Sequence, residues 1–281
     1  DIDVAVERLM MARLKLGMFD SPDRVPFTSI PFEIVGCDVH RELALKAARE
    51  SMVLLKNEGN VLPLNKDMRT IAVIGPNADS RDVLIGNYYG TPNGQVTALE
   101  GIRSKLAGRT RVSYAEGCHL YNLGADHWHD ETQRGFAEAV SVAEHADAVV
   151  ICLGLSPDLE GEEGDVAASD GGGDRAGLDL PGDQLNLLKK ITEVGKPTVL
   201  VVFSGSPVDV GWAQINVNSI IEAWYPGEAG GTALADILFG DHNPGGRLPI
   251  TFPLSVDQLP DFTDYSMKNR TYRHMTSEPL Y

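Results

Sequence analysis

The chain has 281 residues and a formal net charge of −16 at pH 7. Such a polyanionic surface repels nucleic acid and anionic membranes, so neither is an expected partner. Hydrophobic residues make up 43% of the sequence and charged residues 23%, which predicts an ordinary globular core. No apolar run reaches the roughly 18 residues that a membrane-spanning helix needs.

The first residues of the chain bear on its origin, and its cysteines bear on whether it contains disulfides. The sequence begins at Asp1 without a methionine or a charged-then-apolar leader, so we expect a chain that was processed or cut from a longer protein. Localisation stays open, with a secreted or periplasmic location favoured over a cytoplasmic one. Cys37, Cys118 and Cys152 form an odd set without CxxC spacing, which argues against a disulfide framework. Cys152 lies in an apolar run and is predicted to be a buried thiol.

Apolar spacing predicts two helices at the start of the chain. The first contains Val4 and Leu9 on one face and ends near Gly17. A stretch with prolines then runs to Gly36 and is typical of a linker. The second helix is predicted over residues 41–56, with a buried apolar stripe.

From residue 70 onward, short apolar runs alternate with helical stretches. Most runs are apolar throughout, as expected of parallel strands covered on both faces. The predicted fold class is therefore α/β, with a mostly parallel sheet of five to six strands sandwiched between helices and preceded by a linker helix. Functional sites in such sheets lie beyond the carboxyl ends of the strands. The loops to search follow Gly75, Gly154, Gly205 and Pro226. The strands are predicted at 70–75, 111–114, 147–154, 198–205 and 219–224, and the helices at 97–106, 135–145, 181–194 and 231–239.

A long acidic loop follows the predicted strand at 147–154. Carboxylates this close raise one another's pKa, and a raised carboxyl pKa is what a general acid needs near neutral pH. A solvated acidic loop is the structural alternative, and a Ca²⁺ loop is another, although the spacing does not match an EF-hand. The carboxylates are Asp158, Glu160, Glu162, Glu163, Asp165, Asp170 and Asp174.

Other motifs argue against competing chemistries. His127 and His129 form a His-x-His pair without a third ligand at motif spacing, so we expect no metal and no cofactor. No Gly-x-Ser-x-Gly elbow surrounds Ser204 or Ser206, which argues against a serine hydrolase of the usual α/β type. The first sheet strand is not followed by Gly-x-Gly-x-x-Gly, and Pro76 removes an amide that would hold phosphate. Nucleotide binding is therefore not expected.

Several stretches together resemble the C-terminal α/β domain of glycoside hydrolase family 3. They are AARESMVLLKNE at 47–58 with LPL at 62–64, IAVIGPNAD at 71–79, GDR at 173–175 with LDLP at 178–181, WYPGEAGG at 224–231 and GGRLPITFP at 245–253. The resemblance implies an N-terminal (β/α)8 barrel that carries an aspartate nucleophile and is lacking here. It also implies a division into residues 1–40 (the end of a barrel-domain helix and a linker), 41–260 (the α/β sandwich with the acid/base loop) and 261–281 (a tail leading toward a missing C-terminal module).

The resemblance also implies which residue is the acid/base. Xylosidases of the family carry a Glu-x-Glu pair shortly before an aspartate in this loop, which matches Glu160 and Glu162 here and makes Glu162 the acid/base. Glu163 and Glu160 are the alternatives, because the loop varies in length across the family. Asp165 is not followed by arginine, and within this loop an Asp-Arg pair occurs only at residues 174–175, after an insertion.

The function implied by the resemblance is hydrolysis of β-linked glycosides with retention, by a β-xylosidase or β-glucosidase. The expected partners are a β-linked oligosaccharide, such as a xylo-oligosaccharide, and the barrel domain of the same protein. Retaining cleavage needs two carboxyl groups about 5–5.5 Å apart. We therefore predict little or no hydrolase activity for the isolated chain. No substrate-binding residue is assigned, and the alternative is a non-catalytic carbohydrate-binding or scaffold domain.

Overall fold

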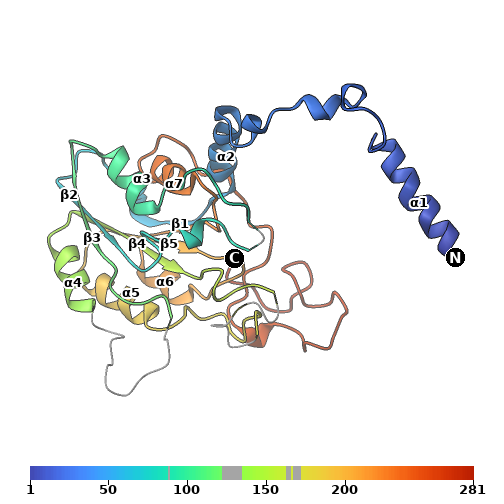
Figure 1. Cartoon of the computed structure of the whole chain (residues 1–281). Coiled ribbons are helices and arrows are strands. Elements are labelled where there is room, and N and C mark those ends of the chain that lie inside the picture. The colour runs from blue at the N-terminus through green and yellow to red at the C-terminus, as the bar shows by residue number, and fades with distance from the viewer. Residues whose placement is uncertain (88, 122–134, 163–165, 167–171) are drawn as a thin grey trace, which may run out of the picture. The chain divides into compact units, whose positions relative to one another are not determined.

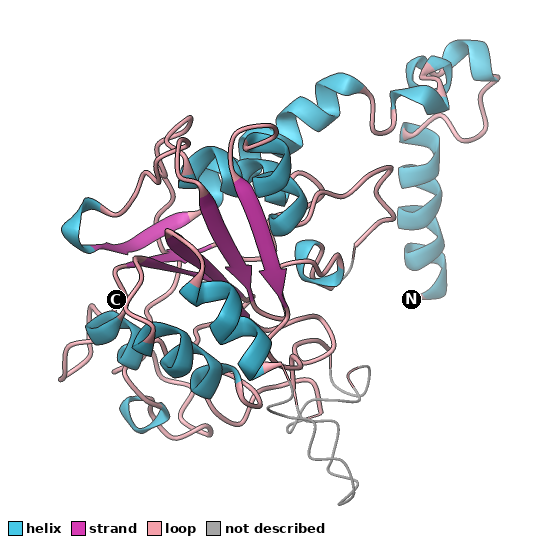
Figure 2. Ribbon diagram, turned by 90° about the vertical axis from the view of Figure 1, so that its left-hand side faces the viewer, coloured by secondary structure: helices cyan, strands magenta, loops and turns pink. Residues whose placement is uncertain are grey.

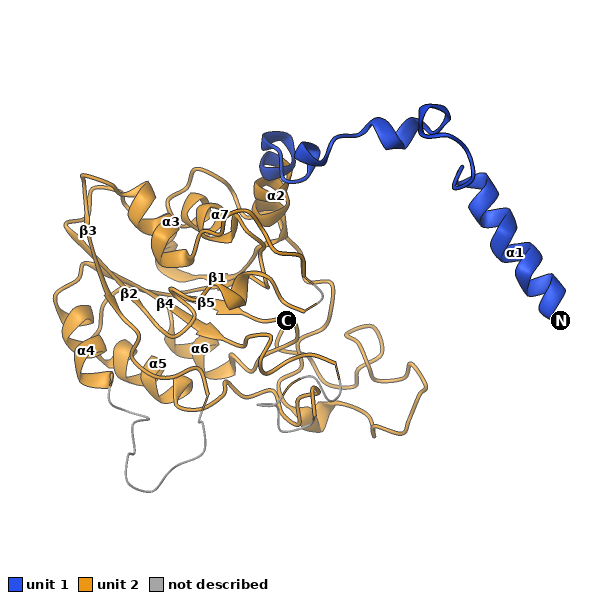
Figure 3. Ribbon diagram, viewed as in Figure 1, with its two compact units in different colours: residues 1–42 blue, residues 43–281 orange. Residues whose placement is uncertain are grey.

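The computed structural model describes residues 1–87, 89–121, 135–162, 166 and 172–281. The chain divides into two compact units, residues 1–42 and 43–281 (Figure 3). The first unit contains helix α1 (Ile2–Lys15), which buries no residue. None of the helices in the described ranges is long and apolar enough to cross a bilayer. Short 3-10 helices cover Pro22–Arg24, Pro26–Ser29 and Phe32–Ile34 in the first unit, and Glu58–Asn60, Asp82–Leu84 and Val256–Gln258 in the second.

The second predicted helix is shorter than the sequence pattern indicates. Helix α2 covers Asp38–Ser51, and Val53–Asn57 forms strand β1 instead of continuing the helix to residue 56. This strand pairs antiparallel with β6 (Ser219–Glu222) at one edge of the sheet. The prediction of helix over 53–56 was wrong because a short apolar run fits either element, and tertiary pairing decided it.

The sheet has six strands in the order β1-β6-β5-β4-β2-β3. Its strands are the magenta arrows in Figure 2. All neighbouring pairs except β1 with β6 are parallel, which confirms the predicted mostly parallel α/β sheet of five to six strands. The central strands β4 and β5 are buried along their whole length, as their unbroken apolar sequences predict. The remaining strands are β2 (Thr70–Ile74), β3 (Arg111–Ala115), β4 (Ala148–Gly154) and β5 (Thr198–Phe203).

Helices cover both faces of the sheet (Figure 1). Along β2, Ile71 and Val73 join one hydrophobic cluster and Ala72 and Ile74 join the other, because side chains alternate along a strand. One cluster contains residues from the end of α2, from α3 (Ala98–Lys105) and from α7 (Gly230–Leu238). The other contains residues from α4 (Phe136–Glu144), α5 (Gln184–Glu193) and α6 (Gly211–Asn216).

A buried ion network fastens the helices on the first of these faces. The carboxylate of Asp236, only 3% exposed, binds the guanidinium of Arg49 and the ammonium of Lys105. Lys105 also contacts Asp241 at 2.8 Å, and Asp241 in turn binds Lys66. The network therefore links α2, α3 and α7 on the side of the sheet opposite α4 to α6.

Candidate active site

Three loops at the carboxyl edge of the sheet converge on Glu160. The residue follows β4, while the loops after the neighbouring strands β5 and β6 supply its hydrogen-bond donors. Oε2 of Glu160 accepts a hydrogen bond from the backbone N–H of Gly205 at 2.8 Å and another from the hydroxyl of Tyr225. Oε1 accepts a hydrogen bond from the hydroxyl of Ser206. The carboxylate of Glu160 therefore joins the three loops.

Tyr225 is suited to be a permanent donor in this cluster. Burial raises the pKa of the Tyr225 hydroxyl, and the negative charge of Glu160 raises it further. The phenol therefore stays protonated at neutral pH and donates its hydrogen bond to Glu160. Space is tight beside this contact, because a Cβ added to Gly205 would lie 3.1 Å from the Tyr225 ring and 3.2 Å from Oε2 of Glu160.

Arg175 connects the far end of the acidic loop to the same cluster. Its Nη1 donates to the carbonyl of Pro207 at 2.9 Å and lies 3.4 Å from Oγ of Ser206. Its Nη2 donates to the carbonyl of Asp179 at 2.8 Å. Burial lowers the pKa of Arg175, while the nearby charge of Glu160 acts in the opposite direction. The guanidinium thus fastens the loop after β4 to the loop after β5.

A fully buried carboxyl group, that of Glu222, lies next to this cluster at the end of β6. Oε1 of Glu222 accepts hydrogen bonds from the hydroxyl of Ser204 at 3.3 Å and from the backbone N–H of Trp224 at 2.9 Å. Within the described ranges, Oε2 of Glu222 has no hydrogen-bond partner. Burial raises the pKa of Glu222 well above its ordinary value, against the lowering effect of these two hydrogen bonds. Ser204 and Trp224 directly precede Gly205 and Tyr225, the residues that donate to Glu160. Glu222 therefore connects the loops after β5 and β6 one residue before each of them contacts Glu160.

The three predicted candidates for the acid/base occupy different environments. Glu160 is partly buried in the cluster, and Glu162 is exposed on the same loop two residues further on. Gly173 lies against the backbone of this segment, since an added Cβ there would be 2.6 Å from the carbonyl oxygen of Glu162. The backbone N–H of Gly161 also donates to the carbonyl of Gly173 at 3.2 Å. Glu163 lies outside the described residues, as do Asp165 and Asp170.

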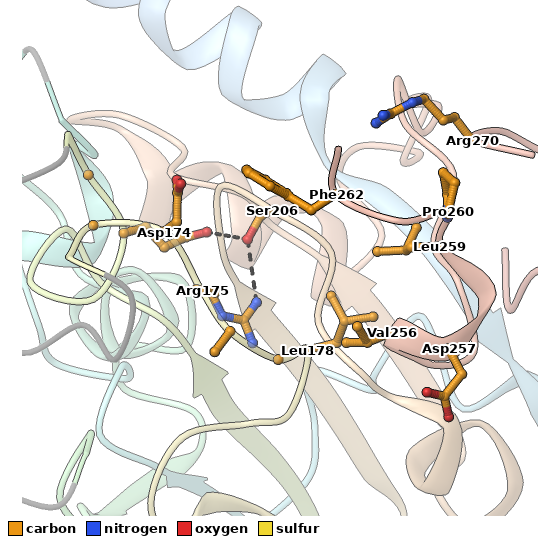
Figure 4. Close-up of a pocket in the computed structure, with 15 residues that line it drawn as sticks. Asp174, Arg175, Leu178, Ser206, Val256, Asp257, Leu259, Pro260, Phe262 and Arg270 are labelled. Carbon is orange, nitrogen blue, oxygen red and sulfur yellow. Dashed lines mark hydrogen bonds between the residues drawn. The ribbon is translucent and has the colours of Figure 1, made fainter. Parts of the chain in front are cut away.

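A pocket of about 1040 Å³ opens next to Glu160 (Figure 4). Ser206 and Arg175 form part of its polar side, together with Asp174. The opposite side comes from residues that follow Phe252 in the chain, and the ring of Phe262 extends from that side toward Asp174 and Ser206. The apolar lining residues of this second side are Val256, Leu259, Pro260 and Phe262.

Two residues of the candidate site, Tyr225 and Glu222, were not predicted from the sequence. Tyr225 lay in the recognised stretch at 224–231 and Glu222 in the predicted strand at 219–224, but no local pattern distinguishes either residue from a packing residue. The rule that sites follow parallel strands did direct attention to the loops after residues 205 and 226. In the described ranges, no group of three His, Cys, Asp or Glu side chains is placed to hold a metal ion. His127 and His129 lie outside those ranges.

Comparison with known proteins gives a consistent family assignment. Residues 52–281 match the model of the glycosyl hydrolase family 3 C-terminal domain. A β-xylosidase of Formosa agariphila is 38% identical over 267 residues, which cover 92% of this chain and 34% of that protein. A probable β-D-xylosidase 7 of Arabidopsis thaliana is 39% identical over 293 residues, covering 100% of this chain and 36% of that protein. The chain thus spans about a third of the length of these relatives.

Solved structures support the same assignment. An exo-β-xylosidase of the family, in complex with a xylobiose aziridine activity-based probe, superposes with a TM-score of 0.84 at 32% identity. The match covers 98% of this chain and 34% of that chain. A β-glucosidase from Erythrobacter marinus superposes with a TM-score of 0.81 at 37% identity, covering 99% of this chain and 38% of that one.

Proposed function

The chain belongs to glycosyl hydrolase family 3, and we propose that it supplies the acid/base domain of a retaining β-xylosidase or β-glucosidase. The aspartate nucleophile of that enzyme would come from a (β/α)8 barrel domain of the same protein. The names of the relatives support this activity, because β-xylosidases and β-glucosidases are the proteins that the chain matches. The observation that carries the proposal is the hydrogen-bonded cluster around Glu160, which fixes an exposed glutamate at the carboxyl edge of the sheet.

Glu162 is the acid/base in this proposal. A general acid must present a proton to the leaving oxygen and later accept a proton from water. Both oxygens of Glu160 already accept hydrogen bonds from other residues of the chain, so they are poorly disposed to face a substrate. Glu162 is exposed and lies on the segment that Glu160 anchors. Glu163, outside the described residues, remains the second candidate.

The proposed reaction proceeds in two steps. The barrel aspartate attacks the anomeric carbon while Glu162 protonates the glycosidic oxygen, so that the bond from the anomeric carbon to that oxygen breaks and the leaving sugar departs. The carboxylate of Glu162 then takes a proton from water, whose oxygen attacks the same carbon and displaces the aspartate. Glu160 acts on neither atom and is a positioning residue, because it fastens the loop that carries Glu162 to the loops after β5 and β6.

A chimera tests this assignment. This chain would replace the corresponding third of the Formosa agariphila β-xylosidase, to which it is 38% identical. We expect Glu162→Gln to slow hydrolysis of an alkyl β-xyloside by about 10²–10⁴-fold. Hydrolysis of an aryl xyloside with a good leaving group should recover when azide is added, with a glycosyl azide as product. Azide needs no general base to attack the glycosyl-enzyme.

Two matched variants make the chimera experiment decisive. Glu163→Gln should retain most of the activity, and Glu160→Gln should lower it without recovery by azide. Azide recovery in either of these variants instead of Glu162→Gln would transfer the acid/base role to that residue. The isolated chain should not turn over aryl β-xylosides or β-glucosides, and turnover that Glu162→Gln abolishes would contradict the need for a second domain.

The alternative function is carbohydrate binding without catalysis. The pocket beside Glu160 favours it, because its polar and apolar sides both come from this chain. A scaffold or binding domain of this kind predicts that none of the three glutamine variants changes turnover by the chimera. A loss confined to one of them supports the catalytic role.

A further inference from the structure

We propose that Glu222 is a positioning residue of the active site, whose buried carboxyl group holds the loop after β4 in place through the donors that bind Glu160. The proposal rests on the function proposed above, because that function places the acid/base Glu162 on this loop. It adds a residue at the end of β6 that is fully buried and does not line the pocket beside Glu160. Glu222 therefore acts only through other residues.

Glu222 is an unusual residue for the end of a buried strand. Its side chain is 0% exposed, as are those of its strand neighbours Ile220 and Ile221. Among the described residues, its Oε2 makes no hydrogen bond. A buried polar atom without a partner costs stability, and an apolar side chain of similar size would avoid that cost. Core packing therefore does not explain a carboxyl group here, so its role must come from the other oxygen.

That other oxygen, Oε1, connects the two loops that supply donors to Glu160. It accepts hydrogen bonds from the hydroxyl of Ser204 at 3.3 Å and from the backbone N–H of Trp224 at 2.9 Å. The next residue of each loop contacts Glu160: the backbone N–H of Gly205 donates to Oε2 of Glu160 at 2.8 Å, and the hydroxyl of Tyr225 donates to the same oxygen. One buried oxygen thus lies one residue before two of the donors to Glu160.

The backbone of Trp224 makes its hydrogen bond to Glu222 important for the direction of the next residue. Trp224 has a φ of 58°, in the left-handed region that residues with a Cβ rarely adopt. Such a conformation persists only where surrounding contacts hold it. The indole Nε1 donates to the carbonyl of Ser51 at 3.2 Å, and the ring packs edge-on against Phe252. The hydrogen bond to Glu222 instead holds the backbone that leads into Tyr225.

Tyr225 has little room to compensate for a change in this turn. A Cβ added to Gly86 would lie 2.9 Å from Cδ2 of the Tyr225 ring, and one added to Gly205 would lie 3.1 Å from Cε2. The ring therefore lies close to the backbone of two other loops. Rotation of the side chain cannot absorb a shift at Trp224, so the shift reaches the hydroxyl that holds Glu160.

The carboxyl group of Glu222 performs this role as a neutral acid. Burial raises the pKa of Glu222 well above its ordinary value, the hydrogen bonds from Trp224 and Ser204 lower it, and the negative charge of Glu160 raises it again. A second negative charge here would repel the carboxylate that the donors hold in place. The position therefore needs a neutral group with an acceptor oxygen. Glutamine supplies one, and leucine, which is similar in size, does not.

Hydrogen exchange of the 281-residue chain tests whether Glu222 holds the donors in place. The reporter is the amide of Gly205, which binds Glu160 and not Glu222. We expect Glu222→Leu to speed its exchange about tenfold, which is the effect of losing one hydrogen bond on a local opening equilibrium. Glu222→Gln keeps the acceptor oxygen, so its exchange at Gly205 should stay within about threefold of that of the unaltered chain.

Asp236→Asn provides the matched control. Asp236 is also a buried carboxyl group, but it belongs to the ion network on α7 and has no contact with Glu160 or its donors. The variant should be less stable yet exchange normally at Gly205. The amide of Val201 within β5 reports global unfolding and shows whether each variant is folded. Normal exchange at Gly205 in Glu222→Leu would overturn the proposal, as would an equal acceleration in Asp236→Asn.

The leaving-group dependence of catalysis tests the connection to the acid. An alkyl xyloside needs its leaving oxygen protonated, whereas an aryl xyloside with an acidic phenol needs this much less. In the chimera described above, Glu222→Leu should lower kcat/KM for the alkyl substrate about tenfold more than for the aryl substrate, because the acid is misplaced. A variant that only loosened the fold would lower both equally. Glu222→Gln and Asp236→Asn should keep the ratio of the unaltered chimera, and an unchanged ratio in Glu222→Leu would contradict the positioning role.

Glu162→Gln, measured in the same assay, separates this proposal from the acid/base assignment. A strong leaving-group dependence in Glu162→Gln with none in Glu222→Leu would refute the role of Glu222 alone. If Glu162→Gln shows no leaving-group dependence, the acid/base assignment fails, and the exchange of Gly205 then decides whether Glu222 positions the loop that Glu160 holds.

Discussion

The hydroxyl of Tyr225 donates a hydrogen bond to the carboxylate of Glu160, so that two residues 65 positions apart in the sequence connect the loops after β6 and β4. The contact is partly buried, and the same carboxylate oxygen also accepts from Gly205. Hydrogen bonds to a charged group contribute more than those between neutral groups. The pair should therefore contribute both to stability and to the placement of the loop after β4, which carries the proposed acid/base residue.

Tyr225→Phe tests the contribution of this hydrogen bond to stability. The ring and its packing remain, while one donor to the carboxylate is lost. We expect the free energy of unfolding, measured by urea denaturation of the chain, to fall by about 1.5–3 kcal/mol. Tyr265→Phe is the control, because its side chain is 85% exposed and its loss of a hydroxyl should be neutral. Equal stability of the two variants would show that Glu160 does not depend on Tyr225.

Glu222→Gln tests the buried carboxyl next to the cluster through the pH dependence of stability. Burial raises the pKa of Glu222 in the folded chain above the ordinary value of 4.5. The folded state therefore keeps a proton that the unfolded state releases, and stability from this group is lost as pH rises above about 4.5. Glutamine carries no such cost. We expect the melting temperature of the variant to exceed that of the unaltered chain by more at pH 7 than at pH 4, and a gap independent of pH would contradict this.

The elements that could be predicted are those whose pattern is complete within a short stretch of sequence. Strands β4 and β5 were predicted because runs that are apolar throughout fit only a strand covered on both faces or a buried helix, and they are too short for the latter. Strand β1 was not predicted, because its identity depends on pairing with β6, which lies more than 160 residues further along the chain. Helix α6 has only six residues and gives too short a pattern to detect.

The same distinction applies to the candidate site. The acidic loop was found because it follows a recognisable strand and is crowded with carboxylates. The different environments of Glu160 and Glu162 were not predictable, since they depend on donors from Ser206 and Tyr225 in two other loops. The contribution of the segment around Phe262 to the pocket was also invisible, because that segment has little regular structure and no known motif.

Gly101→Ala should destabilise the chain, which is opposite to the usual effect of replacing a glycine by alanine inside a helix. Alanine normally stabilises a helix interior relative to glycine. In α3, however, a Cβ on Gly101 would lie 2.0 Å from the carbonyl oxygen of Gly231, so α3 and α7 would have to separate. We expect a loss of about 1–3 kcal/mol in the free energy of unfolding. Gly94→Ala, where an added Cβ meets no atom within 4 Å, should be close to neutral, and a stabilised Gly101 variant would contradict the close helix contact.

Asp236→Ala tests the ion network that joins α2, α3 and α7. The carboxylate of Asp236 is 3% exposed and binds both Arg49 and Lys105, so its removal leaves two cations without their shared partner. Breaking a buried ion pair from one side costs about 3–5 kcal/mol. Because Arg49 and Lys105 are 33% and 24% exposed and can partly rehydrate, we expect a loss at the lower end of that range.

Asp241→Ala is the matched control for this prediction. The carboxylate of Asp241 is 39% exposed and shares Lys105 with Asp236. Solvent replaces an exposed partner readily, so this second variant should lose less than about 1 kcal/mol. Urea denaturation of both variants measures the difference, and equal losses would show that burial of Asp236 does not govern the strength of the network.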